Sequence, residues 1–264
     1  MRSHVRSITC TAAMALGLAP AAFAQTNSPA PAQEWTVITT SHIKPEFRQE
    51  YEAGQKELTA AYIKGGAPYR IVLQTMLGDM MEYTTVVPLG KFAEFDAPTP
   101  VVKALGDMGS QKLLKRVGAY LMDVHRATEL SMPDISINTP MENMGKYAQV
   151  SIIRLFPGKA AEFASFMKDD YLPAMRKGDI ANLWTSRPVF GGDLNERVTV
   201  MPMQRMAQLD GGPVLTKAVG ADAARKINEK RNTIVESTRY MVVQVRTDLS
   251  HMPSMAPGAK PAAE

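Results

Sequence analysis

Apolar and polar positions follow the same succession of patterns twice between Trp35 and Ser250. Runs rich in β-branched and aromatic residues predict strands, and apolar residues three or four positions apart predict helices. The first series predicts strands at 35–43, 69–77, 80–88 and 120–130, with helices from Pro45 and from about Pro100. The second series predicts strands at 147–156, 181–190, 196–203 and 239–249, with helices from Pro157 and from Pro213. Each series therefore runs strand, helix, strand, strand, helix, strand.

Two short sequence matches align the two series. Residues 103–106 read Lys-Ala-Leu-Gly and residues 217–220 read Lys-Ala-Val-Gly, both in the second helical region of their series. Residues 128–131 (Thr-Glu-Leu-Ser) match residues 247–250 (Thr-Asp-Leu-Ser) at the end of the last strand. We interpret the chain as a tandem duplication of one unit of roughly a hundred residues. The predicted repeats are 34–133 and 146–251, with a Pro-containing linker at 134–145.

This element order predicts how the two repeats associate. A β-α-β-β-α-β unit forms a four-stranded antiparallel sheet with both helices on one face, so its other face needs cover. We expect an α+β fold in which two ferredoxin-like repeats pack sheet to sheet in one pseudo-symmetric body.

On this order, and on patterns such as Ile43-Lys44-Pro45-Glu46-Phe47, the chain resembles the dimeric α+β barrel superfamily from Trp35 to about Ser250. That group includes antibiotic-biosynthesis monooxygenases and the NIPSNAP-like and EthD-like proteins. The resemblance implies an intramolecular dimeric α+β barrel. It also implies that the activities known in the group are relevant, namely oxidation of small aromatic or polyketide substrates and haem degradation, peroxidation or dismutation.

The haem-binding patterns of such relatives are incomplete in this chain. The haem-degrading members have an asparagine on the first strand, and neither 35–43 nor 147–156 contains one. The haem peroxidase relatives carry Gly-x-x-Asp-Gly, and the nearest stretch, 207–211 (Ala-Gln-Leu-Asp-Gly), lacks the first glycine. We therefore predict no cofactor.

The N-terminal residues are typical of a secretory signal peptide. Arg2, His4 and Arg6 precede an apolar stretch at 8–19, and Ala22-Phe23-Ala24 follows it, which predicts a signal at 1–24 with cleavage after Ala24. An apolar stretch of about 12 residues is shorter than the roughly 20 needed to span a bilayer. We expect a periplasmic or secreted protein without a membrane span, with flexible Pro- and Ala-rich segments at 25–33 and 252–264.

Composition excludes several classes of site. Cys10, the one cysteine, lies in the predicted signal, so the remainder has neither a disulfide nor a cysteine metal site. Removal of Arg2 and Arg6 lowers the net charge from +4 to +2, too little to indicate nucleic-acid binding. The chain has 4 histidines, one of them in the signal, which argues against a histidine-rich metal site. Its 18 methionines suit Cu(I), but they lack histidine or cysteine partners and also serve as flexible core residues.

The last strand of each series carries the candidate catalytic residues. Alternation places Asp123 and His125 on one face of the first of these strands, and Gln244 and Arg246 on one face of the second. If the face formed by 241, 243 and 245 packs on the helices, all four side chains point to the space between the sheets. An aspartate that orients a histidine provides a general base, and an arginine holds a carboxylate or an enolate. The alternative is a polar cluster that hydrogen-bonds to itself.

Trp184 and Tyr83 lie on the predicted hairpin strands, where they form pocket walls or simply part of the core. We expect His42 at a solvated strand end. If the ligand lies between sheet and helices instead, Tyr51 and Tyr62 become the relevant residues.

We therefore predict a binding protein for a small organic ligand, with or without cofactor-independent monooxygenase-like activity. The predicted catalytic residues are His125, Asp123 and Arg246, and the predicted ligand-binding residues are Gln244, Trp184 and Tyr83. The alternative is a non-catalytic ligand-sequestering or assembly protein of the same fold. A solvent-connected cavity of a few hundred cubic ångströms favours binding, and a filled interior favours a scaffold.

Overall fold

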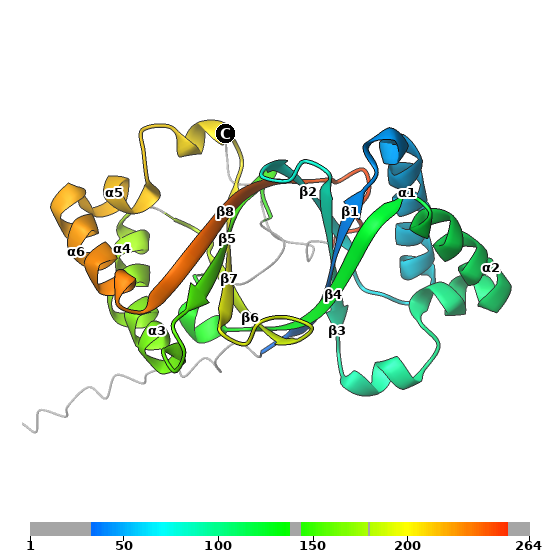
Figure 1. Ribbon diagram of the computed structural model, residues 1–264, viewed down its shortest axis with the longest axis horizontal. Helices are drawn as coiled ribbons and strands as arrows, with labels where there is room; N and C mark the ends of the chain where they lie inside the picture. Colours follow the sequence, from blue (N-terminus) through cyan, green and yellow to red (C-terminus); the bar gives the residue numbers. More distant parts are fainter. Residues whose placement is uncertain (1–32, 138–143, 179, 253–264) are drawn as a thin grey trace, which may run out of the picture.

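The computed structural model describes residues 33–137, 144–178 and 180–252. Its centre is a closed antiparallel barrel of eight strands in the order β1-β3-β2-β8-β5-β7-β6-β4. The helices of the two halves lie on opposite outer sides of this barrel (Figure 1). The strands are β1 (Trp35–Ile43), β2 (Ile71–Leu77), β3 (Glu82–Leu89), β4 (Leu121–Ser131), β5 (Tyr147–Leu155), β6 (Trp184–Phe190), β7 (Glu196–Met203) and β8 (Val235–Val245).

Helices connect the strands in the expected order in both halves. The α-helices are α1 (Arg48–Lys64), α2 (Pro100–Gly118), α3 (Ala160–Phe166), α4 (Leu172–Lys177), α5 (Val214–Val219) and α6 (Ala221–Asn232). A π-helix, η5 (Met167–Tyr171), joins α3 to α4. Short 3-10 helices are η1 (Pro45–Phe47), η2 (Phe92–Asp96), η3 (Pro133–Ile135) and η6 (Met206–Leu209).

The sheets of the two halves are hydrogen-bonded to each other along both edges. β2 pairs with β8, where Leu73 is opposite Val245, and β4 pairs with β6, where Leu130 is opposite Arg187. We expected two sheets packed face to face, and the structure instead closes them along these two seams. Closure pairs the backbone N–H and C=O groups that the edge strands would otherwise expose.

An apolar cluster lies inside the barrel. It is formed by Ile71, Leu73, Val86, Ala148, Val150, Met241, Val243 and Val245. The face of β8 that carries Met241, Val243 and Val245 therefore points into the barrel, and the expectation that it packs on the helices was wrong. Val242 takes that place and belongs to the apolar cluster of the second half, which includes Phe163 of α3. Both faces of β8 are covered at residues 241–243, which are all apolar, so alternation cannot identify the inner face there.

Two helical regions contain a break at a glycine. The region predicted from Pro213 divides into α5 and α6 at Gly220, where φ is 81° and ψ is 164°. Within α2, Gly106 has φ 70° and ψ 173°. Side-chain-bearing residues rarely adopt positive φ, so both breaks depend on glycine. β8 begins at Val235 rather than at 239, because the polar residues 236–239 pair with β5 instead of continuing the helix.

The predicted signal peptide (1–24), residues 25–32, residues 138–143 of the predicted linker and the tail from 253 lie outside the described residues. In the described part of the linker, Ile135 and Ile137 are buried in the core of the second half. Ile137 also forms an isolated antiparallel bridge with Leu183. Among the residues that the structure describes, no helix combines the length and the apolar character needed to cross a bilayer.

Candidate functional site

A cavity of about 880 Å³ lies in the second half, between the outer face of the sheet and the helices. Alternate residues of three adjacent strands form its floor, as expected when every second side chain points to one face. These are Gln149, Ser151 and Ile153 of β5, Thr199 and Met201 of β7, and Tyr240 and Val242 of β8. Apolar residues of the helices form much of the opposite wall, namely Phe163, Phe166, Met167, Met175, Val214 and Leu215.

The π-helix η5 lies in this wall. Pro173, near the start of α4, has no N–H to donate to a preceding carbonyl, which favours a local departure from α-helical hydrogen bonding. The wider turn contributes both Met167 and Tyr171 to the cavity. Single π-helical turns of this kind are frequent at functional sites.

Helix α6 adds polar side chains to the cavity lining. Asn228, Arg231 and Asn232 line the cavity, and their spacing of three and four residues places them on one face of the helix. Arg231 donates a hydrogen bond from Nη2 to the hydroxyl of Thr238. Burial raises the pKa of Tyr171 to about 12, with a further increase from Tyr240 and an opposing effect of Arg231. Tyr171 is therefore a protonated hydrogen-bond donor at neutral pH.

The cavity reaches solvent beside the first half of the chain. Leu77 at the end of β2 is 55% exposed, Tyr240 of β8 is 59% exposed, and both line the cavity. Leu77 is opposite Val242 in the β2–β8 pairing, so the seam between the halves brings it to this position. The exposed part of the lining thus includes residues of both halves.

The corresponding space of the first half is filled. Tyr51 of α1 and Tyr83 of β3 are fully buried there, with ring centroids 5.1 Å apart in an edge-to-face arrangement. Arg70 is buried beside them and donates hydrogen bonds to Thr59 Oγ1 at 2.6 Å and Gln55 Oε1 at 2.5 Å. Tyr62 is the other tyrosine expected to matter in a site between sheet and helices. Its ring centroid lies 5.4 Å from Cζ of Arg70.

The structure does not bring Asp123 and His125 into contact with each other. Asp123 Oδ1 lies 2.8 Å from Nδ1 of His42, whereas His125 Nε2 contacts the carbonyl oxygen of Gly191. The hydrogen bond to Asp123 is the main cause of a raised pKa at His42, and Asp79 and Glu82 add to it. His42, which we expected to be solvated, thus has a carboxylate partner.

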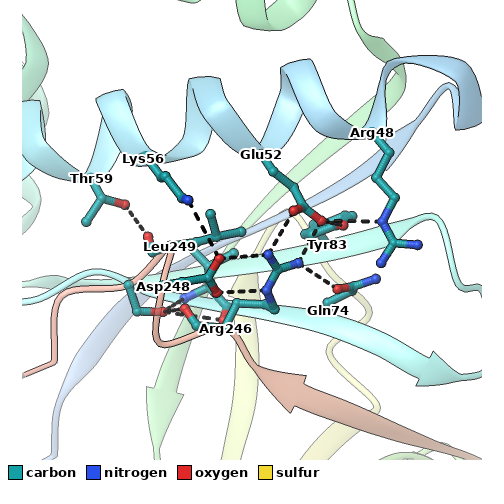
Figure 2. Close-up of polar contacts among 11 residues, drawn as sticks. Arg48, Glu52, Lys56, Thr59, Gln74, Tyr83, Arg246, Asp248 and Leu249 are labelled. Atoms are coloured by element: carbon teal, nitrogen blue, oxygen red, sulfur yellow. Dashed lines mark hydrogen bonds and ion pairs between the residues drawn. The ribbon is translucent and has the colours of Figure 1, made fainter.

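Arg246 and Gln244 are far from that pair in the barrel, because three strands separate β4 from β8 in either direction. Arg246 lies just beyond β8 and binds Glu52 of α1, Asp248 and Gln74 (Figure 2). Arg246 is the main cause of a low pKa, about 2, at Glu52. Gln244 is opposite Gln74 in the β2–β8 pairing.

The two predicted pocket aromatics lie outside the cavity lining. Tyr83 is a core residue whose hydroxyl donates to Glu52 Oε1 at 2.5 Å. Trp184 is opposite Val200, which contacts the apolar barrel interior, so Trp184 is on the inward face of β6. The chemical roles assigned to the six predicted site residues remain predictions.

Sequence reasoning missed the residues that line the cavity. The available signal was the set of polar residues at alternate positions of otherwise apolar strands, Gln149 and Ser151 in β5 and Thr199 in β7. Neither a carboxylate nor a histidine is among the described residues that line the cavity. In the described ranges, no group of three or more histidine, cysteine, aspartate or glutamate residues has a metal-binding arrangement.

No family model matches this sequence, and no curated protein matches it. Solved structures resemble its fold at low sequence identity. A candidate monooxygenase from Lactobacillus acidophilus NCFM has a TM-score of 0.55 and 12% identity, covering 82% of this chain and 95% of that one. An anthrone oxidase-like protein has a TM-score of 0.53 and 12% identity, covering 89% of this chain and 98% of that one.

A chlorite dismutase variant from Candidatus Nitrospira defluvii, in complex with cyanide, has a TM-score of 0.50 and 11% identity, covering 80% of this chain and 90% of that one. These neighbours are dimeric α+β barrel proteins. The likeness extends over both halves of the chain and shows that it has this fold.

Proposed function

We propose that this protein binds a small, largely apolar organic molecule in the cavity between the β5–β7–β8 face and helices α3 to α6. The observation that carries the proposal is the cavity itself, whose volume of about 880 Å³ is within the usual range for ligand pockets. Its lining is mainly apolar, with a smaller number of polar side chains from β5, β7 and α6. The matching space of the first half is filled by its own side chains, so one ligand per chain is expected.

The wall favours an aromatic ligand. Phe163 and Phe166 offer ring faces and edges, and Met167 and Met201 offer thioethers, which make favourable contacts with aromatic rings. Methionine side chains also adapt to differently shaped ligands. A flat molecule of two or three fused rings fits this chemistry.

The proposal includes a tandem duplication of a ferredoxin-like unit and export by a signal peptide at 1–24. Support for the duplication comes from Gly106 and Gly220, which end the matched segments 103–106 and 217–220 and have nearly the same φ and ψ. In this view one copy retained a hollow under its helices and the other filled it. The N-terminal pattern supports a periplasmic or secreted location.

A second candidate function is cofactor-independent oxidation of the bound ligand, as in a monooxygenase. Two polar residues of the lining favour it, because the Tyr171 hydroxyl and the Arg231 guanidinium can stabilise an oxyanion that forms on the ligand. With anthrone and O₂, the methylene carbon loses two hydrogens and gains one oxygen atom as a ketone. The second oxygen atom leaves with the two hydrogens as water.

Ligand titration tests the binding proposal. N-phenyl-1-naphthylamine, a neutral aromatic probe that fluoresces in apolar sites, should bind saturably at one site per chain. Ser151→Trp fills the cavity from its floor and should weaken this binding by about tenfold or more. The matched control is Thr39→Trp, at the corresponding fifth residue of β1, which should bind as the wild type does.

Equal binding by the wild type and Ser151→Trp would contradict the proposed site, provided that circular dichroism shows both to be folded. Oxygen uptake with anthrone tests the second function. Uptake that the wild type supports and Ser151→Trp loses is expected for an enzyme. Binding without uptake identifies a ligand-sequestering protein instead.

A further inference from the structure

We infer that the ligand of this cavity carries an anionic group, such as a carboxylate, sulfonate or phenolate, and that Arg231 holds it. This inference rests on the proposed function, since it concerns the same cavity. It names the chemical class of the ligand: an aromatic or otherwise apolar body with an acidic group at one end.

The first observation is that Arg231 lacks a protein counter-ion among the described residues. It is the one charged residue among the described residues that line the cavity, and its hydrogen bond goes to the neutral hydroxyl of Thr238. Two other cations of α6 do have acidic partners. Arg225 pairs with Glu229 at 2.7 Å, and Lys230 pairs with Asp170.

The second observation is that hydrogen-bond donors line the same cavity as Arg231. Tyr171 is one of them, and its hydroxyl is protonated at neutral pH. Asn228 lies one turn before Arg231 on the same face of α6, and its amide supplies further N–H groups. The cavity lining thus includes a guanidinium, a phenol and an amide, all of which can donate hydrogen bonds to a ligand.

The chemistry of these groups selects an anion. A guanidinium presents a planar set of N–H donors that matches carboxylate and sulfonate oxygens, and hydrogen bonds between charged partners are the stronger ones. The partly enclosed setting reduces the screening of this attraction by water. A neutral ligand would leave the positive charge without a counter-ion, because the other described residues of the lining are uncharged.

Two probes with the same ring system test the inference. 8-anilinonaphthalene-1-sulfonate has the skeleton of N-phenyl-1-naphthylamine and adds one sulfonate. Arg231→Gln should weaken binding of the sulfonate probe by about tenfold to a hundredfold, the range expected for a lost charged hydrogen bond. The neutral probe should change by less than about twofold, which also shows that the variant is folded. Arg231→Lys should recover part of the loss.

Arg225→Gln is the matched control on the same helix, because it removes an exposed arginine that already has an acidic partner. It should leave the binding of both probes unchanged. In the wild type, added salt should weaken binding of the sulfonate probe more than that of the neutral one.

The outcomes separate the two proposals. If Arg231→Gln weakens both probes equally, or neither of them, the anionic class is overturned while the cavity remains the binding site. If neither probe binds the wild type, or if Ser151→Trp binds both as well as the wild type does, the proposed function and this inference both fail.

Discussion

Arg246 donates from Nη1 and Nη2 to the two carboxylate oxygens of Glu52, at 2.6 and 2.8 Å. This bidentate pair joins the end of β8, from the second half of the chain, to α1 of the first half (Figure 2). Paired hydrogen bonds between ionised planar groups are both strong and directional. The contact therefore fixes the helical layer of one half to the last strand of the other, next to the β2–β8 seam.

Loss of this pair should destabilise the protein. We expect Glu52→Gln to lower the free energy of unfolding by about 2 kcal/mol, because the partly buried Arg246 then lacks its main partner. Urea denaturation followed by circular dichroism measures the change. The control is Glu57→Gln on the same helix, which removes an exposed pair with Arg116 and should cost less than about 0.5 kcal/mol. Equal losses in the two variants would contradict the role given to Glu52.

The same carboxylate should make stability depend on acid pH. The pKa of Glu52 falls from its ordinary value of 4.5 to about 2 in the folded protein. A lowered pKa stabilises the fold above the ordinary pKa, and that contribution is lost as pH falls toward about 2. The wild type should lose more stability between pH 6 and pH 3 than Glu52→Gln does. Parallel losses in urea titrations at the two pH values would exclude this contribution.

The contact between His42 and Asp123 should be visible in the titration of the histidine. The folded protein raises the pKa of His42, chiefly through this hydrogen bond. Asp123→Asn should therefore lower it, as followed by NMR of the imidazole ring. Because the pKa is raised, the contact stabilises the protein at acid pH and its contribution is lost as pH rises through the folded-state value. An unchanged His42 titration in Asp123→Asn would show that the contact does not form in solution.

The glycine at the break between α5 and α6 should resist substitution. Gly220 has φ 81°, and no neighbouring atom would contact an added Cβ, so any effect of Gly220→Ala comes from the backbone conformation. We expect a loss of about 1 kcal/mol, measured by thermal denaturation. Gly118→Ala at the end of α2 also meets no neighbour and has no positive φ, and it should be neutral or stabilising. A loss at Gly118 as large as at Gly220 would refute the conformational argument.

Much of the fold could be predicted from local pattern. The bounds of β1 and β7 agree with the expected 35–43 and 196–203, because β-branched runs mark them clearly. The inner face of β8 could not be predicted. Met241 and Val243 face the barrel and Val242 faces the helices, and all three are buried apolar residues that carry no directional signal.

The site was harder to predict than the fold. Alternation placed Asp123 and His125 together on β4, but their partners are His42 of β1 and Gly191 of the β6–β7 hairpin, which only the strand register brings near. The residues of the cavity wall could not be recognised from the sequence, because Phe163 and Met201 follow the pattern of ordinary core residues. Whether such residues touch each other or leave a space depends on how far the helices stand from the sheet.

The position of β8 has a consequence for how the molecule is made. This last strand lies between β2 and β5, so its residues complete the hydrogen bonding of one early and one central strand. During synthesis the barrel can close only after residue 245, the end of β8, has left the ribosome. A product that stops earlier presents two bare strand edges, which invite aggregation or proteolysis. A chain that ends before β8 therefore lacks the strand that closes the barrel.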